Sequence, residues 1–275
     1  MRLPDVARGL ALCRVCGWNQ VAADWEQLLA LGGDGCLVAE VDGEVAGTLT
    51  AVAYERRFAW IGMVLVDPAL RGRGIATALM RRSLDALGDV EARLDATPQG
   101  EPLYARLGFV EESRLCRMTR EGAIGSGRPD PMARAMEERD LDAVLARDLA
   151  AFGADRSDLL RWAFRRAPAL AWVIDGEAGP RGYCFGRPGH RWSQVGPIVA
   201  DEAAAGGRLA RACLSATGGA ALVIDAAAGV PGWVDALGSL GFVSQRPFIR
   251  MRRGTPNRRA GDGGGQLAIL GPEWG

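Results

Sequence analysis

The stretch from Trp60 to Leu87 constrains the fold of this chain more than any other. Residues 61–66 form a short, nearly continuous apolar run, which is typical of a strand buried on both faces. From Ala76 to Leu87 apolar residues recur at three- and four-residue spacing, and Gly88 follows where helices commonly stop. Between the two lies Arg71-Gly-Arg-Gly74. The sequence therefore predicts a buried strand, a glycine-rich turn and an amphipathic helix.

A turn of this kind has a chemical use. The backbone N–H groups at a helix start have no intrahelical partner, and they point outward with the positive end of the helix dipole. Gly72 and Gly74 carry no side chain that would keep a phosphate away. The turn is therefore predicted to hold a pyrophosphate.

Two common pyrophosphate-binding loops do not fit this turn. A dinucleotide fingerprint starting at Gly72 needs Gly or Ala at position 77, but this residue is Thr77. A Walker-type loop needs a lysine, and the chain has none, since all 33 of its basic residues are arginine. Both interpretations are excluded.

Two sequence motifs resemble those of the GNAT N-acetyltransferases. Arg71-x-x-Gly74-x-Ala76 resembles their Q/R-x-x-G-x-G/A loop, and Tyr104-Ala-Arg-Leu-Gly108-Phe109 resembles their Tyr-x-x-x-Gly-Phe segment. Gly17-Trp-Asn-Gln20 and Leu94-Asp-Ala-Thr-Pro98 are similar to the tandem-GNAT group of the YitH/HolE type. The resemblance implies an α/β (α+β) fold of two tandem GNAT-like domains, each a mixed, mostly antiparallel sheet flanked by helices. It also implies an acetyl-CoA-dependent N-acyltransferase.

The resemblance further implies where acetyl-CoA would bind. Gly62 interrupts the predicted strand, and in this family such a break splays two strands so that pantetheine lies between them. The predicted cofactor-binding residues are Val64, Leu65, Val66, Arg71, Gly72, Arg73, Gly74, Ile75, Ala76, Thr77 and Thr97.

Tyr104 is the predicted catalytic residue. An attacking amine must lose a proton, and a leaving thiolate, with a thiol pKa of ~8.5, departs better when it is protonated. Tyr104 matches the general acid of the family, four residues before Gly108. The base stays open at this point: Asp24, Glu111, Glu273 and a water chain are all compatible with the sequence.

The N-terminal helices are predicted to lie on the acceptor side of the cleft, as the resemblance implies. The candidate substrate residues are Trp18, Asn19, Gln20 and Trp25. The structural alternative, which the sequence leaves open, makes the tryptophans core anchors and Asn19 a helix cap.

The second half of the chain repeats the first. Gly182 follows Gly47 by 135 positions, and Gly241 follows Gly108 by 133. The repeat has lost its chemistry, because two acids stand where the phosphate turn should be, in Ala200-Asp-Glu-Ala, and Leu237 stands at the tyrosine position. We therefore predict a degenerate second domain that shapes the acceptor pocket, while the first binds one acyl-CoA.

Domain boundaries follow from the repeat and from two segments rich in glycine and proline. We predict a catalytic domain at 1–122, a linker at 123–131, a degenerate domain at 132–254, and a flexible tether with a docking C-terminal segment at 255–275.

Composition excludes several classes of partner. The chain has 33 basic and 33 acidic residues, so charge favours neither nucleic acid nor an anionic membrane. No apolar run approaches the ~18 residues of a membrane span, and the N-terminus lacks a secretion signal. We expect a cytoplasmic protein, a monomer or homodimer, that acts on a small-molecule amine. The alternatives left open are a protein amine acetyltransferase and a non-catalytic acyl-CoA sensor.

No metal is expected. Cys13 and Cys16 have the spacing of half a zinc site, but no second pair follows and His190 is the only histidine. The two cysteines are predicted to share a buried helix face. His190 could act as a base, although a surface-loop position is favoured.

Overall fold

The computed structural model describes residues 1–122, 130–177, 179–255 and 265–275. Most of the predicted linker and most of the predicted tether lie outside these residues. The described residues form two compact units. Unit 1 holds 1–112, 250–255 and 273–275, and unit 2 holds 113–122, 130–177, 179–249 and 265–272. The predicted domain boundaries themselves stay a prediction.

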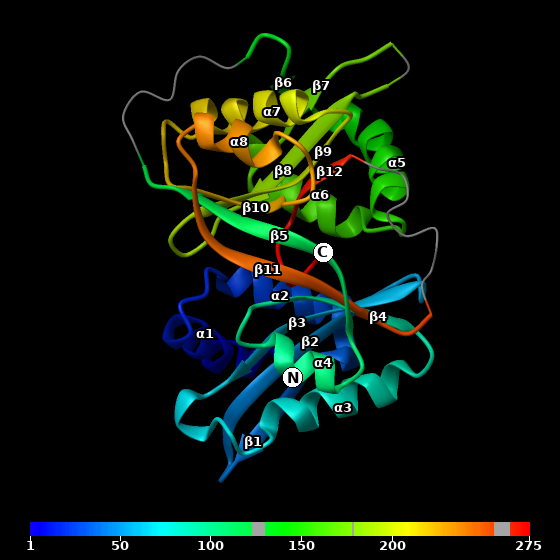
Figure 1. The fold of residues 1–275 in the computed structure, drawn as a ribbon, viewed down its shortest axis with the longest axis vertical. Helices are drawn as coiled ribbons and strands as arrows, with labels where there is room; N and C mark the ends of the chain where they lie inside the picture. Colours follow the sequence, from blue (N-terminus) through cyan, green and yellow to red (C-terminus); the bar gives the residue numbers. More distant parts are fainter. Residues whose placement is uncertain (123–129, 178, 256–264) are drawn as a thin grey trace. The chain divides into compact units, whose positions relative to one another are not determined.

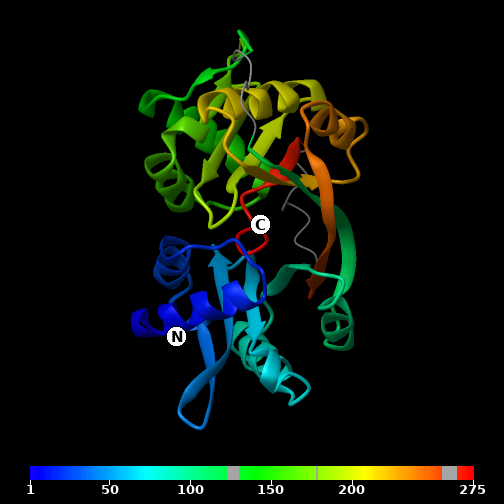
Figure 2. The ribbon, with the colours of Figure 1, turned by 90° about the vertical axis from the view of Figure 1, so that its left-hand side faces the viewer.

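Unit 1 is a sheet covered by helices on both faces. Its elements are α1 (Val6–Val15), α2 (Ala22–Gly32), β1 (Leu37–Val41), β2 (Glu44–Tyr54), β3 (Phe58–Val66), α3 (Ile75–Leu87), β4 (Glu91–Ala96) and α4 (Glu101–Arg106), with short 3₁₀ helices at Leu3–Asp5, Gly33–Gly35 and Pro68–Leu70. The first three strands pair antiparallel, and β3 pairs parallel with β4. Helices α1 and α2 lie on one face of this sheet and α3 on the other (Figure 2). The strand, turn and helix predicted between Trp60 and Leu87 are confirmed.

The first hairpin of unit 1 forms where Asp42-Gly43 predicts it. Both residues have positive φ, 53° and 80°, as a two-residue turn of the primed type requires. Strands β1 and β2 then pair with Val41 opposite Glu44.

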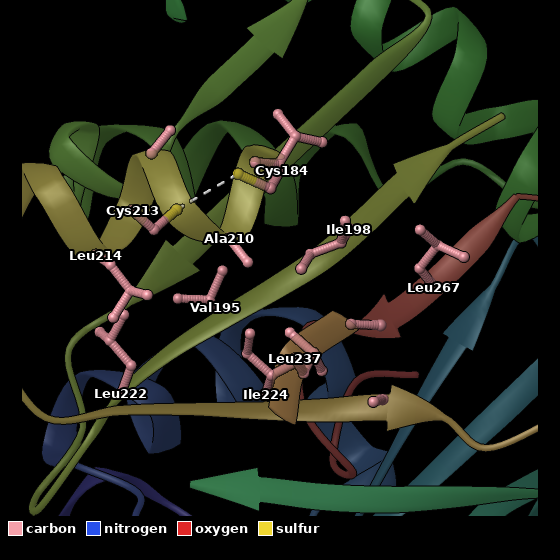
Figure 3. Packing of buried hydrophobic residues seen from close by; sticks show 14 of the residues in the cluster. Cys184, Val195, Ile198, Ala210, Cys213, Leu214, Leu222, Ile224, Leu237 and Leu267 are labelled. Atoms are coloured by element: carbon pink, nitrogen blue, oxygen red, sulfur yellow. Dashed lines mark hydrogen bonds between the residues drawn. The ribbon is translucent and has the colours of Figure 1, made fainter. Parts of the chain in front are cut away.

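Unit 2 has the same plan. Its elements are β6 (Arg134–Ala135), α5 (Leu141–Phe152), α6 (Ser157–Arg166), β7 (Trp172–Ile174), β8 (Gly182–Arg187), β9 (Ser193–Ala200), α7 (Ala203–Ala216), β10 (Leu222–Ala227), α8 (Trp233–Ser239) and β12 (Gln266–Ile269), with 3₁₀ helices at Glu138–Asp140 and Pro168–Leu170. Its core packs α7 and α8 against the sheet, with Leu237 and Ile224 inside and the Cys184 and Cys213 sulfurs 3.6 Å apart (Figure 3).

The repeat is visible in the turns that follow α4 and α8. The Phe109 N–H donates to the Tyr104 carbonyl at 3.1 Å, and the Phe242 N–H donates to the Leu237 carbonyl at the same distance. Gly108 and Gly241 have φ of 86° and 85°, a region that suits glycine. The predicted internal repeat is confirmed as a structural repeat.

The last strand of each repeat belongs to the other unit. β5 (Val110–Arg120) follows α4 in sequence, yet from Ser113 onward it belongs to unit 2, where it pairs with β10. β11 (Val243–Arg253) follows α8, yet from Arg250 onward it belongs to unit 1, where β4 is its neighbour. Figure 1 shows these two long strands in green and orange.

Matched side chains fasten the exchanged strands. In unit 2, Arg117 binds Asp225 through two hydrogen bonds of 2.7 Å, and both side chains are buried. In unit 1, Arg250 binds Asp95 in the same two-pronged way, at 2.9 and 3.0 Å. Arg250 follows Arg117 by 133 positions, the offset of the repeat. Each unit therefore holds the strand of the other repeat through an equivalent arginine.

The C-terminal strand β12 inserts between two strands of unit 2. β9 and β10 pair parallel only at Ser193↔Leu222 and Gln194↔Val223. Beyond that point β12 pairs antiparallel with β10 on one side and β9 on the other. The sequence predicted that this segment docks but not where.

No helix in the described ranges combines the length and apolar character that crossing a membrane requires. No group of three or more His, Cys, Asp or Glu side chains in these ranges is placed to hold a metal ion.

Candidate active site

A β-bulge interrupts β3 directly after Gly62. Thr48 pairs with Leu65 and Thr50 pairs with Gly62, so one residue of β2 faces two residues of β3. Met63 sits in the bulge with φ of 51°, which is unusual for a residue with a side chain. The Thr48 hydroxyl donates to the Met63 carbonyl at 2.8 Å and holds this conformation. Backbone strain of this kind persists where the surrounding structure fixes it, commonly at functional sites.

The two parallel strands of unit 1 separate near the bulge. β3 and β4 pair from Phe58↔Glu91 to Trp60↔Arg93 and no further. Residues 64–66, which include the predicted cofactor contacts Val64, Leu65 and Val66, lie beyond that point, paired with β2 on their other side. Their backbone N–H and C=O groups that face away from β2 therefore do not pair with β4. This is the strand separation that the sequence predicted at Gly62.

The glycine turn leads from β3 into α3 without a side-chain cap. Gly72 and Gly74 have φ of 79° and 80°, and Gly74 is the N-cap residue of α3. Having no side chain, Gly74 leaves the first N–H groups of α3 without a cap. A Cβ added at either glycine would meet no described atom within 4 Å, so the space beside the turn is open.

The predicted turn residues all lie on this one structure. Arg71 and Arg73 are exposed, and Ile75, Ala76 and Thr77 form the first turn of α3. The Arg71 guanidinium donates to the Cys16 sulfur at 3.3 Å. Cys16 lies just after α1 and is half-buried, whereas Cys13 is buried within the helix, so the prediction that both are buried on one helix face is correct only for Cys13.

Asp67 fixes the start of the turn. Its carboxylate accepts hydrogen bonds from the Ala69 N–H at 3.0 Å and from the Arg8 guanidinium at 2.6 Å. These contacts, the backbone one first, hold the pKa of Asp67 below its usual value. The turn is thereby anchored to α1 on one side and to its own backbone on the other.

Thr97 lies in the turn after β4 and Tyr104 in α4, and both side chains come close to Gly100 between them. A Cβ at Gly100 would lie 2.9 Å from the Tyr104 ring and 3.5 Å from the Thr97 hydroxyl oxygen. Tyr104 is 9% exposed, and burial raises the pKa of its hydroxyl to about 12. The phenol is therefore protonated throughout the neutral range, as proton donation requires.

The loop between α1 and α2 holds three of the predicted substrate residues. Arg14 donates to the carbonyls of Trp18 and Gln20, at 2.8 and 2.6 Å, and so fixes the loop. Asn19 and Gln20 are buried and Trp18 is half-buried. The fourth residue, Trp25, is fully buried in α2, with its ring against Gly9. Trp25 thus has the position of a core anchor, and the substrate roles of all four stay predictions.

The last residues of the chain are built into unit 1. Glu273 is buried, and its carboxylate accepts a hydrogen bond from the Gln20 amide at 3.0 Å. The Tyr54 hydroxyl donates to the Trp274 carbonyl at 2.9 Å. A Cβ at Gly62 would lie 2.7 Å from the Glu273 Cα, so Glu273 packs directly on β3 before the bulge.

The three open base candidates occupy different positions. Asp24 is buried at the start of α2, where it accepts the Val21 N–H at 2.8 Å. Glu111 lies in an exposed part of β5. Of the three, Glu273 is the one packed against Gly62 of β3.

The equivalent region of unit 2 is closed. Only Asp201 and Glu202 separate β9 from α7, so no glycine loop exists there. Asp201 is engaged by Arg147 at 2.5 Å and by Arg181 at 3.5 Å. The space between β9 and β10 is taken by β12, and Leu237 at the tyrosine position is fully buried near Ile224 and Leu267 (Figure 3).

The sequence did not predict three features of these sites. They are the insertion of β12, the exchange of β5 and β11, and the contact of Glu273 with Gly62. The apolar run Leu267-Ala-Ile-Leu270 was a signal for a docking strand, but its partners lie far away in sequence.

Comparisons with known proteins agree on the fold and the family. Residues 13–109 match the model of the acetyltransferase (GNAT) family, and residues 144–263 match that of an acetyltransferase (GNAT) domain. The "Holothin acyltransferase" of Pseudoalteromonas sp. is 27% identical over 86% of this chain and 81% of its own length. The rice protein named "Probable glucosamine 6-phosphate N-acetyltransferase 2" is 32% identical over 38% of this chain and 70% of its own length.

A solved structure reproduces the whole fold. The crystal structure of a protein from Pyrococcus horikoshii, described as an acetyltransferase, superposes with a TM-score of 0.79 at 24% identity, covering 100% of this chain and 94% of the other. Both predicted halves are thus GNAT domains, and the fold class predicted from the sequence is confirmed. The chain belongs to the GNAT acetyltransferases and is a tandem member of that family.

Proposed function

We propose that this enzyme transfers the acetyl group of acetyl-CoA to the amine of a small molecule, by direct attack in a ternary complex, at a single site in unit 1. The observation that carries the proposal is the succession of a strand bulge and an uncapped glycine turn along one βα unit. This arrangement offers unpaired backbone donors at both places, which suits the pyrophosphate and the pantetheine amides of a CoA thioester.

The residue roles follow from position. The N–H groups of the turn and of residues 75–77 would bind the pyrophosphate, with Arg71 and Arg73 adding positive charge. The outward backbone of Val64 to Val66 would pair with pantetheine as a neighbouring strand does. Thr97, which lies close to Gly100 as Tyr104 does, stays a candidate cofactor contact.

Tyr104 would supply the proton for the leaving thiolate. Acetyl-CoA provides an activated acyl carbon, and the chain has to position it, accept the proton of the amine and protonate the sulfur. A tyrosine hydroxyl with its ordinary pKa of ~10 is already neutral at pH 7, and burial, which raises the pKa of Tyr104 to about 12, keeps it neutral well above that pH. It therefore acts as a donor rather than as a base.

A small-molecule acceptor has support from the names of relatives. One relative is named for holothin and another for glucosamine 6-phosphate. The proposal takes from them only the class, a compact amine. It places the enzyme in the cytoplasm, as a monomer or homodimer.

The test is a thiol-release assay with the full chain, acetyl-CoA and a panel of amines. Glucosamine, benzylamine, spermidine and lysinamide sample amino sugars, monoamines, polyamines and amino acid amides. Release of CoA that depends on an amine, with the acetylated amine found by mass spectrometry, supports the proposal. Binding of acetyl-CoA without turnover would indicate a sensor, and acetylation only of a peptide N-terminus or lysine would indicate a protein acetyltransferase.

A further inference from the structure

The C-terminal residues of unit 1 bring a buried carboxylate against β3, directly before the bulge. Glu273 is 1% exposed, and Gln20 is 4% exposed. Charged side chains are rarely buried to this extent without a partner or a function. The Gln20 amide N–H donates to the Glu273 carboxylate at 3.0 Å and so orients one carboxylate oxygen. The carbonyl oxygen of the same Gln20 amide is the second feature of this pair.

The Gln20 carbonyl oxygen is an acceptor without a donor. It is fully buried, and among the described residues no hydrogen-bond partner reaches it. An unsatisfied buried acceptor costs free energy, and a native structure that retains one invites an explanation by ligand binding. An ammonium suits this pair, because it has several N–H bonds to donate to the Gln20 carbonyl oxygen and a positive charge that the neighbouring carboxylate attracts.

The surroundings of Glu273 connect this pair to the bulge of β3. Its Cα and Cβ would lie 2.7 and 2.9 Å from a Cβ at Gly62, and Met63 of the bulge follows Gly62 in the chain. Glycine at position 62 is therefore what lets Glu273 approach β3 so closely. The C-terminus is held there from both sides, by the Tyr54 hydroxyl on the Trp274 carbonyl and by the Trp60 ring against Gly275.

A nearby thiol is excluded from the same role. Cys13 on α1 is buried, and its pKa is raised to about 12, mainly by burial and to a smaller extent by the charge of Glu273. Cys13 is thus a neutral thiol at pH 7 and cannot act as a base there.

From these contacts we infer that Glu273, oriented by Gln20, binds the ammonium of the acceptor and accepts its proton. The inference rests on the proposed function and names the base of that reaction. The ammonium gives one proton to the Glu273 carboxylate and becomes a nucleophile. Its nitrogen then forms a bond to the acetyl carbon while the carbon–sulfur bond breaks. The second amine proton ends on the sulfur through Tyr104, and the proton on Glu273 passes to water.

The test compares Glu273→Gln with the wild-type chain, using the most active amine of the panel between pH 7 and pH 10. At pH 7 we expect kcat/KM for the amine to fall by ~10²–10⁴. The variant has to draw on free amine, whose fraction rises about tenfold per pH unit up to a pKa near ~10, so its deficit should shrink as the pH rises. Calorimetry should show acetyl-CoA binding within about twofold of wild type.

Two further variants separate catalysis from docking of the C-terminus. Glu273→Asp keeps the charge, so it should be slower yet show the pH profile of the wild type. Glu26→Gln, on an exposed position of α2, should change nothing. If Glu273→Gln does not fold, the pH profile of Glu273→Asp decides instead. If Glu273 is the base, Glu273→Asp should be slower than wild type per folded molecule, with a pH profile of the same shape. If Glu273 is only structural, the activity of Glu273→Asp should fall only in proportion to the loss of folded protein.

Two results would overturn the inference while leaving the proposed function intact. One is full activity of Glu273→Gln at pH 7, and the other is a deficit of the same size at every pH together with weakened acetyl-CoA binding. Failure of the wild-type chain to acetylate any amine would instead overturn the proposed function, and this inference with it.

Discussion

The two βα units that begin at β3 and at β9 are repeats of one another, but they end in different ways. Asp67 and Asp201 each follow the strand directly, and each pairs with an arginine, Arg8 or Arg147. After Asp67 the chain makes a glycine loop before α3, whereas after Asp201 only one residue precedes α7. The two repeats therefore share the strand, the aspartate and the helix, but only the first has the glycine loop to which we assign CoA binding.

The two units also differ in what lies between their parallel strands, β3 and β4 in unit 1 and β9 and β10 in unit 2. In unit 1, β3 and β4 stop pairing after Trp60 and Arg93, and the outward backbone beyond is not used by β4. In unit 2, the equivalent gap is filled by β12, which satisfies the backbone of β9 and β10. A splayed pair of strands needs something to occupy it. One repeat meets this need with its own chain, and under the proposed function the other leaves it to the pantetheine of acetyl-CoA.

The largest effect on acetyl-CoA binding is expected from Gly74→Asp. An acidic side chain at the N-cap of α3 would repel a pyrophosphate and occupy its approach, costing at least one charge-assisted hydrogen bond of ~1.5–3 kcal/mol. Acetyl-CoA binding measured by calorimetry should weaken by about tenfold or more. Gly74→Asn is the matched control, because it has the same shape and tolerates the positive φ but carries no charge. Equal binding by the Asp and Asn variants would contradict the assignment of the turn.

Tyr104→Phe should act on rate rather than on binding. The ring and its edge contact with Phe109, at 6.1 Å between centroids, are kept, and only the hydroxyl is lost. We expect kcat to fall by ~10²–10⁴ under conditions where chemistry limits turnover, with little change in KM for acetyl-CoA. Full kcat in this variant would return Tyr104 to a packing role.

The pH profile sharpens the same prediction. Burial raises the pKa of Tyr104 to about 12, so the protonated form persists through pH 10. The wild-type rate should therefore show no loss from ionisation of Tyr104 below about pH 11. A fall in kcat with a midpoint near pH 8 to 9 that Tyr104→Phe abolishes would show an ionisation that this account does not contain.

The seat of β12 in unit 2 can be tested with two adjacent glycines of α7. A Cβ at Gly206 would lie 2.3 Å from Leu267 of β12 and 3.0 Å from the Trp233 ring, whereas a Cβ at Gly207 would meet only Ala236, at 3.9 Å. Gly206→Ala should destabilise the chain by about 1–3 kcal/mol. Gly207→Ala should stabilise it by about 0.5–1 kcal/mol, because alanine favours the helix.

Denaturant unfolding of both glycine variants measures this difference. Acetyl-CoA binding serves as the second readout, and it should be unchanged in each. Similar stabilities for the two variants would mean that β12 does not pack against α7 as described.

The smallest effect is expected from Asp201→Asn. Arg147, first, and Arg181 hold the pKa of Asp201 below its usual value, so the carboxylate adds stability above an unfolded pKa of ~3.9 and loses it as the pH falls below that. The pair is largely exposed and screened, so the loss at pH 7 should be a few tenths to about 1 kcal/mol. The difference from wild type, followed by thermal melting, should vanish toward pH 2. Altered acetyl-CoA binding would contradict the inactive role of this position.

Local chemistry explains what could be predicted from the sequence. The Asp42-Gly43 hairpin, the helix ending at Gly88 and the turn at Gly74 are determined by residues close together in the chain. Even the bulge was signalled, because a glycine in a strand marks a weak point of pairing. The repeat was visible because matched glycines keep nearly the same offset, 135 and 133 positions.

Long-range pairing explains what could not. Nothing in 266–269 specifies β9 and β10 as neighbours, since an apolar strand can pair with any open edge. The exchange of β5 and β11 could not be predicted for the same reason. Arg117 and Arg250 are equivalent residues of the two repeats, and from the sequence each could pair with the aspartate of its own repeat as well as with that of the other. From the sequence, Glu273 could not be distinguished from the other candidate bases. Only its contacts with Gly62 and Gln20 in the folded chain do so.

The most direct test of the central claim is the number of acetyl-CoA molecules bound per chain. Isothermal titration of the full chain should give a stoichiometry of one; Gly74→Asp should weaken that binding by about tenfold or more, while Asp201→Asn leaves both stoichiometry and affinity unchanged. Two molecules per chain, or one bound by Gly74→Asp with the affinity of the wild type, would contradict the claim that only the first repeat keeps a CoA site.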